Sequence, residues 1–114
     1  MLIFGILSTS VASAEPSPTV QTEVNFLLRY TEQSGCDFYR NGTWHDAKAA
    51  QTHLRDKYNY LVERNMISSV DDFIQKAATQ SSFTGQVYLV RCNGSAPVTS
   101  SLWLYAELAR YRKF

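Results

Sequence analysis

Two cysteines, Cys36 and Cys92, constrain the fold of this chain more than any other feature of its sequence. If they are bridged, they close a loop of about 56 residues, which stabilises a folded chain by roughly 4 kcal/mol in the chain-entropy model. The bridge would also tie the N-terminal half of the chain to a strand near its end. The alternative is one reactive thiol beside a buried partner, and the compartment decides between the two.

The first residues indicate that compartment. Residues 2–7 are nearly all apolar, and small residues follow them. Residues 12–14, Ala-Ser-Ala, are typical of a signal-peptidase site, with Glu15 as the first mature residue. The apolar stretch is far shorter than the roughly 20 residues of a membrane span. We therefore predict a signal peptide at residues 1–14 and no stable membrane insertion after its removal; the alternative is an apolar first helix that stays in the fold.

Export makes the disulfide the favoured interpretation, because exported chains meet an oxidising environment. A domain of about 100 residues buries only about 60–65% of its unfolded surface, so a covalent link matters to it. The charge balance is nearly neutral, with 11 Lys and Arg against 10 Asp and Glu, a formal net charge of +1. This balance argues against nucleic acid as a partner, since such binders need a basic surface.

The chain then divides into short helices and strands. Residues 15–18 form a polar tether in which two prolines bar a helix before Thr19. Thr19 or Thr22 can cap a first helix, which Gly35 ends. Residues 36–40 and 43–45 are predicted strands, joined by Asn-Gly, the strongest short hairpin signal.

The second half continues this pattern. Asp46 is predicted to cap a helix that runs to about Asn65, and Ser68 or Ser69 to start a third helix. Residues 86–92 are the strand with the clearest β-propensity, and a last helix begins near residues 99–101. The prediction is a single α+β domain over residues 19–114, with about four helices packed on one face of a small three-stranded antiparallel sheet and one disulfide.

Several spaced motifs together resemble the YfeK-like family of small exported bacterial proteins, a domain of unknown function. The resemblance covers roughly residues 23–112, and its motifs are Ser-Gly-Cys-Asp-Phe-Tyr-Arg-Asn-Gly at 34–42, His-Leu-Arg-Asp-Lys-Tyr at 53–58, Asp-Phe-Ile at 72–74, Ser-Ser-Phe-Thr-Gly at 81–85, Tyr-Leu-Val-Arg-Cys at 88–92, and Trp103 with Arg110 near the end. It implies a periplasmic location and a paired cysteine. It implies no activity, substrate or catalytic residue.

The residues themselves predict no catalytic constellation. His45 and His53 lack a carboxylate at metal-ligand spacing, so we expect no metal site and no cofactor. No Gly-x-Ser-x-Gly elbow is present, and we assign no catalytic residue. The alternative function is a small envelope hydrolase that uses Ser81 or Ser82 as nucleophile with His53 as base. The competing interpretation of the two serines is a turn whose hydroxyls cap backbone groups.

The leading hypothesis is a non-enzymatic periplasmic module that binds an envelope protein or a cell-wall component. Side chains from the hairpin tip, the second helix and the loop after the third helix are predicted to form its binding surface: Arg40, Asn41, His53, Lys57, Ser81 and Ser82. For His53 the competing interpretation is a structural hydrogen bond to the sheet or a loop.

Overall fold

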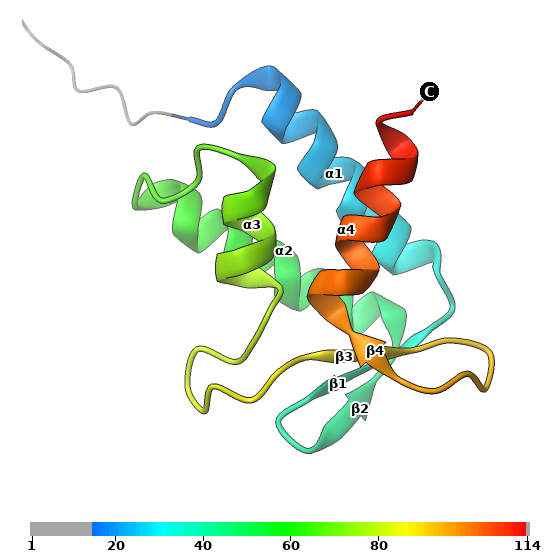
Figure 1. Cartoon of the computed structure of the whole chain (residues 1–114). Helices are drawn as coiled ribbons and strands as arrows, with labels where there is room; N and C mark the ends of the chain where they lie inside the picture. Colours follow the sequence, from blue (N-terminus) through cyan, green and yellow to red (C-terminus); the bar gives the residue numbers. More distant parts are fainter. Residues whose placement is uncertain (1–14, 114) are drawn as a thin grey trace, which may run out of the picture.

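A computed structural model describes residues 15–113, so the predicted signal peptide at residues 1–14 lies outside the described part. The described chain has the α+β architecture that the sequence predicts, with all four helices on one side of a small sheet (Figure 1). The elements are α1 (Pro18–Gln33), β1 (Asp37–Arg40), β2 (Thr43–His45), α2 (Ala47–Glu63), α3 (Val70–Ala77), β3 (Leu89–Arg91), β4 (Val98–Thr99) and α4 (Ser100–Tyr111).

The helices begin at capping side chains. The Asp46 carboxylate accepts a hydrogen bond from the Ala49 N–H at 2.8 Å, and Ser69 and Thr99 cap α3 and α4 in the same way. These starts confirm the predicted caps. The start of α1 differs, because Ser17 is the N-cap and Pro18 is the first helical residue. Proline is tolerated there, since its missing N–H would have no helical partner, so the polar tether is shorter than predicted.

The sheet has four antiparallel strands in the order β2-β1-β3-β4, which corrects the prediction of three. The strand missed is β4, two residues that directly follow Pro97 and are too few to show an alternating pattern. The predicted strand at 86–92 is also shorter, since regular pairing covers only Leu89–Arg91. Upstream of it, Gln80 and Val87 form an isolated bridge.

The turn between β1 and β2 has the predicted hairpin geometry. Asn41 and Gly42 have φ values of 50° and 86°, as a type I′ turn requires at both central positions. The pair Arg40 and Thr43 closes the hairpin. The Arg40 side chain is therefore held at the end of a strand, beside a rigid turn.

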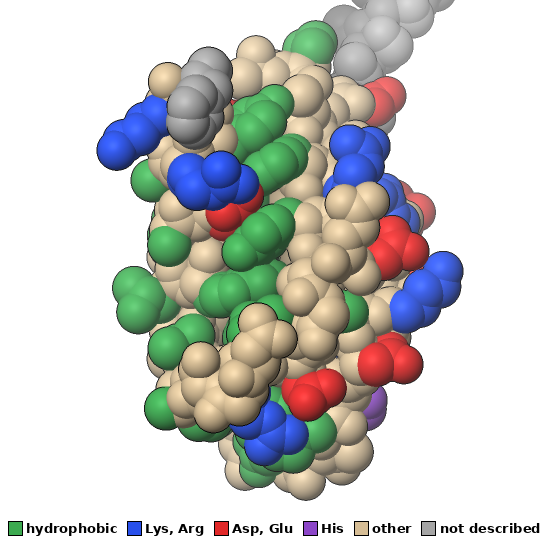
Figure 2. Space-filling view, turned by 90° about the vertical axis from the view of Figure 1, so that its right-hand side faces the viewer, with side chains coloured by type: hydrophobic (Ala, Val, Ile, Leu, Met, Phe, Trp, Pro, Cys, Tyr) green, Lys and Arg blue, Asp and Glu red, His purple; other side chains and the backbone are tan. Residues whose placement is uncertain are grey.

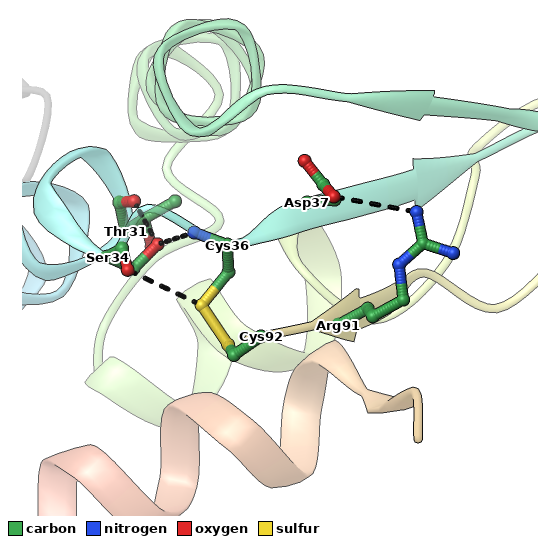
Figure 3. The surroundings of a disulfide bond; sticks show 6 residues. All are labelled: Thr31, Ser34, Cys36, Asp37, Arg91 and Cys92. Atoms are coloured by element: carbon green, nitrogen blue, oxygen red, sulfur yellow. Dashed lines mark hydrogen bonds and ion pairs between the residues drawn. A yellow bond between two sulfur atoms is a disulfide. The ribbon is translucent and has the colours of Figure 1, made fainter. Parts of the chain in front are cut away.

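The disulfide between Cys36 and Cys92 is present, and neither cysteine is a free thiol. Cys36 directly precedes β1 and Cys92 directly follows β3, so the antiparallel pairing of these strands places their Cα atoms 4.4 Å apart (Figure 3). Beside the bridge, the Ser34 hydroxyl accepts a hydrogen bond from the Cys36 N–H at 3.2 Å. The alternative of a reactive thiol with a buried partner is therefore wrong.

Buried side chains form two adjoining clusters. The larger one joins the four helices through residues such as Leu27, Tyr58, Phe73 and Leu104. The smaller one lies between α2 and the sheet and contains Cys36, Phe38, Ala47, Ala50 and Val90. Trp103 of α4 packs against both clusters and so connects the helical layer to the sheet.

Candidate functional site

A pocket of about 140 Å³ lies where the hairpin, α2 and the loop before β3 meet. The structure brings all of the predicted binding residues to this pocket and adds two others to its lining: Arg40, Asn41, His53, Lys57, Ser81, Ser82, Phe83 and Tyr88. We refer to these residues as the basic pocket. That it binds a ligand stays a prediction.

Regular elements position the two cations of the pocket. Arg40 is the last residue of β1, next to the Asn41-Gly42 turn. His53 and Lys57 are four residues apart on α2, so they project from the same face of the helix. Both are half-buried, because the adjacent turns of α2 pack on the sheet and on α3.

Besides the hairpin and α2, the loop at residues 81–86 lines the pocket, and Asn41 holds this loop in place. The Asn41 amide nitrogen donates to the Ser81 hydroxyl at 3.2 Å, and its amide oxygen accepts from the Thr84 hydroxyl at 2.7 Å. The Ser81 hydroxyl also accepts from the N–H groups of Phe83 and Thr84, and Ser81 is only 3% exposed. Asn41 and Ser81 therefore shape the pocket, and their hydrogen-bonding atoms are already used.

Tyr88 links His53 and Lys57 at the base of the pocket. Its hydroxyl oxygen lies 3.1 Å from Lys57 Nζ and 3.1 Å from His53 Nε2. An ammonium group can only donate, so the Tyr88 oxygen accepts from Lys57, while the direction of its hydrogen bond with His53 Nε2 depends on the imidazole tautomer. In the tautomer protonated on Nδ1, His53 Nε2 accepts the Tyr88 proton; in the tautomer protonated on Nε2, it donates to the Tyr88 oxygen.

The electrostatic environment favours the neutral form of the His53 imidazole. Burial lowers the pKa of His53 to about 4, and Arg40 and Lys57 add to the effect, as His45 does more weakly, while Asp56 opposes it. Burial, followed by Arg40, lowers the pKa of Lys57, and burial raises the pKa of the Tyr88 hydroxyl. His53 therefore stays uncharged beside the two cations at neutral pH.

This environment predicts that the protein loses stability as the pH falls from about 6.5 to about 4. The unfolded chain takes up a proton on His53 in this range, whereas the folded chain does not, so protonation favours unfolding. Urea unfolding across the range should show a smaller loss of stability for His53→Gln than for the wild type. A His53 ring that titrates near 6.5 in the folded protein, measured by NMR, would contradict the expectation.

The pocket carries uncompensated positive charge. The described residues form five ion pairs, and neither Arg40 nor Lys57 takes part in any of them. No Asp or Glu lines the pocket. Two cationic side chains therefore face it without a carboxylate partner.

A wider groove of about 510 Å³ adjoins the basic pocket. The two share His53, Lys57, Ser82 and Phe83, and the groove continues over Tyr60 and Leu61 of α2, with Asp56 and Lys76 also in its lining. Phe83 is 96% exposed and stands between the two spaces. We refer to this space as the adjoining groove.

The residues of the hydrolase predicted as the alternative line the same pocket, but the two serines are not hydrogen-bonded to His53. His53 Nε2 is hydrogen-bonded to Tyr88, and among residues 15–113 neither Ser81 nor Ser82 forms a hydrogen bond to His53. Ser81 acts as the turn-capping residue of its competing interpretation. Within the same range, no three His, Cys, Asp or Glu side chains gather as a metal site would require.

Two lining residues were not named individually among the predicted binding residues, although Phe83 lies in the predicted loop at residues 81–85. Tyr88 is 6% exposed and stands just before β3, where its β-propensity suggested only a strand residue. Phe83 is an apolar residue in the middle of a polar loop, and that mismatch was the available signal. What the sequence could not show is that the loop folds back onto the hairpin.

A second surface feature lies away from the pocket. Figure 2 shows hydrophobic side chains in a band down the side of the molecule on which α4 lies. Between α1 and α4, aromatic rings follow one another: Tyr111 stacks on Phe26 with centroids 4.1 Å apart, and Tyr30 contacts Trp103 at 4.6 Å. These rings are partly buried against each other, so their apolar surface already has partners.

Comparisons with known proteins give a family and no activity. The family of unknown function DUF5329 matches residues 18–112. A protein of Salmonella typhimurium, described as uncharacterized protein YfeK, is 32% identical over 87 residues, which span 75% of this chain and 71% of that protein. No solved structure matches the chain. No helix within residues 15–113 is long and apolar enough to cross a membrane.

Proposed function

This chain belongs to the family of unknown function DUF5329, and we propose that it is a non-enzymatic binding module of the bacterial periplasm that holds an envelope component in the basic pocket. The observation that carries this proposal is the pocket itself. It joins side chains from the hairpin, α2 and a distant loop, and its two cations, Arg40 and Lys57, have no carboxylate partner. Half-buried charges without a carboxylate to balance them are costly, which supports a role in binding an anion.

A periplasmic location has separate support. The Cys36–Cys92 disulfide is of the kind that persists in oxidising compartments. Residues 1–14 have the composition of a signal peptide. After export, the mature chain should begin at Glu15 and be recovered in the periplasmic fraction.

Crosslinking in intact cells tests the binding function. The substitution Phe83→benzoylphenylalanine places a photoreactive group between the basic pocket and the adjoining groove. Leu102 of α4 is also exposed and lies outside both spaces, so Leu102→benzoylphenylalanine is the matched control. We expect an envelope adduct from position 83 that position 102 does not give. Equal yields at the two positions, or no adduct at position 83, would remove the proposal.

A further inference from the structure

We infer that the ligand is an organic anion whose carboxylate or phosphate group lies between Lys57 and Arg40, with its apolar part in the adjoining groove against Phe83. This inference rests on the proposed function and names the chemical class of the ligand. It follows from which hydrogen-bonding atoms of the pocket are occupied and which remain available.

The available charged donors come from Lys57 and Arg40. Lys57 Nζ has three N–H bonds and uses two of them, to the Gln80 carbonyl at 3.2 Å and to the Tyr88 hydroxyl at 3.1 Å. One donor remains. The Arg40 guanidinium has no hydrogen-bond partner among the side chains and carbonyls of residues 15–113. Its planar donors suit a carboxylate or phosphate, which offers two or more oxygens.

The acceptors of the pocket, in contrast, are largely in use. Asn41 Oδ1 accepts from Thr84, the Ser81 hydroxyl accepts from two backbone N–H groups and from Asn41, and His53 Nε2 is hydrogen-bonded to the Tyr88 hydroxyl. A cationic ligand would meet two positive charges, with the Ser82 hydroxyl as a side-chain acceptor that has no other hydrogen-bond partner among residues 15–113. A ligand that supplies oxygens and negative charge meets the donors that are left.

The size of each space divides the ligand into two parts. The basic pocket, at about 140 Å³, admits one carboxylate or phosphate with its immediate attachment, whereas the adjoining groove has about 510 Å³. Phe83 is 96% exposed and Tyr60 is 54% exposed, so both rings have apolar surface that a ligand could remove from water. An anionic group joined to an apolar chain therefore matches both spaces.

Probes of equal chain length test the inference. We expect hexyl phosphate and hexanoate to shift the amide NMR signals of residues 40–41, 53–57 and 81–88 in the full chain, and hexanol and hexylammonium to leave them unchanged. Whichever of the two anions binds with the higher affinity shows whether phosphate or carboxylate is the preferred group. Inorganic phosphate and acetate, which lack the chain, should bind more weakly than their hexyl counterparts.

Variants connect that binding to the two cations. Lys57→Met should weaken the binding of the stronger probe by about tenfold or more, since one hydrogen bond to a charged group has that effect. Lys48→Met removes the same charge from the same helix outside the pocket and should leave affinity unchanged. If Lys57→Met does not fold, Arg40→Gln on the opposite wall provides the same comparison, and Lys57→Arg should keep binding.

The outcomes separate this inference from the proposed function. If hexanol binds as tightly as the two anions, or if Lys48→Met weakens binding as much as Lys57→Met, the anionic ligand is overturned. The adduct from position 83 in cells would then still support a binding module for another ligand. Loss of that adduct removes the proposed function itself.

Discussion

Replacing both cysteines, Cys36→Ser with Cys92→Ser, is expected to lower the free energy of unfolding by about 2–4 kcal/mol. The bridge closes a loop with a sequence separation of 56, and its loss restores that conformational freedom to the unfolded chain. A domain of this size is stable by only about 5–15 kcal/mol, so the effect is a large fraction of the total. Urea unfolding at about pH 7 gives the measurement.

The same loss should follow reduction of the wild-type bridge, which serves as the control for the serine side chains. The bridge joins β1 and β3 just outside their paired residues, and the basic pocket takes Arg40 from β1 and Tyr88 from the residue before β3. We therefore expect the basic pocket of the reduced protein to unfold at a lower urea concentration than the larger cluster between the helices. Unchanged stability after reduction would contradict this account of the fold.

Phe73→Ala is expected to lower the free energy of unfolding by about 3–5 kcal/mol. The Phe73 ring is 1% exposed in the larger cluster and meets the edge of Tyr58 with centroids 5.6 Å apart, so its removal leaves a cavity between α2 and α3. Phe83→Ala is the matched control, because Phe83 is 96% exposed and its loss should change stability by less than about 0.5 kcal/mol.

The paired substitutions also separate folding from binding. Urea unfolding of both variants should show a large difference between them. Phe83→Ala should keep a native fold while it weakens binding of the hexyl probes, since Phe83 lines both spaces. Equal losses of stability for the two variants would contradict the assignment of Phe73 to the core and of Phe83 to the surface.

Much of the fold could be predicted from local signals in the sequence. A type I′ turn requires positive φ at both central positions, and the Asn41-Gly42 dipeptide adopts it readily. Asp46 and Ser69 have side chains that accept hydrogen bonds from the first N–H groups of a helix. Each of these signals depends on neighbours in the chain alone. The elements that they start were therefore predicted close to their observed positions.

Elements that depend on distant partners were not predicted. Val98 and Thr99 form a strand only because β3 pairs with them, and two residues carry no periodic signal. Pro18 begins α1 because a proline at the first helical position loses no hydrogen bond, an exception to its usual effect. The first error arises from a distant partner, whereas the second arises from the local preference of proline for the first helical position.

The basic pocket was predicted in part. The hairpin tip, the face of α2 with His53 and Lys57, and the serine loop could each be identified as polar segments. The contacts of Asn41 with Ser81 and Thr84 join residues 40 and more positions apart, and no local pattern predicts them. The hydrogen bonds of Tyr88 to His53 and Lys57 likewise join residues more than 30 positions apart, and no local pattern predicts them.

The position of hexyl phosphate in its complex tests the binding site most directly. Intermolecular NOEs locate the protons of its hexyl chain relative to the aromatic rings of the protein. If the hexyl chain lies in the adjoining groove, as we infer, its protons should give NOEs to the rings of Phe83 and Tyr60. NOEs to Phe26, Tyr30 and Trp103 instead would place the ligand on the aromatic face between α1 and α4, and would contradict the assignment.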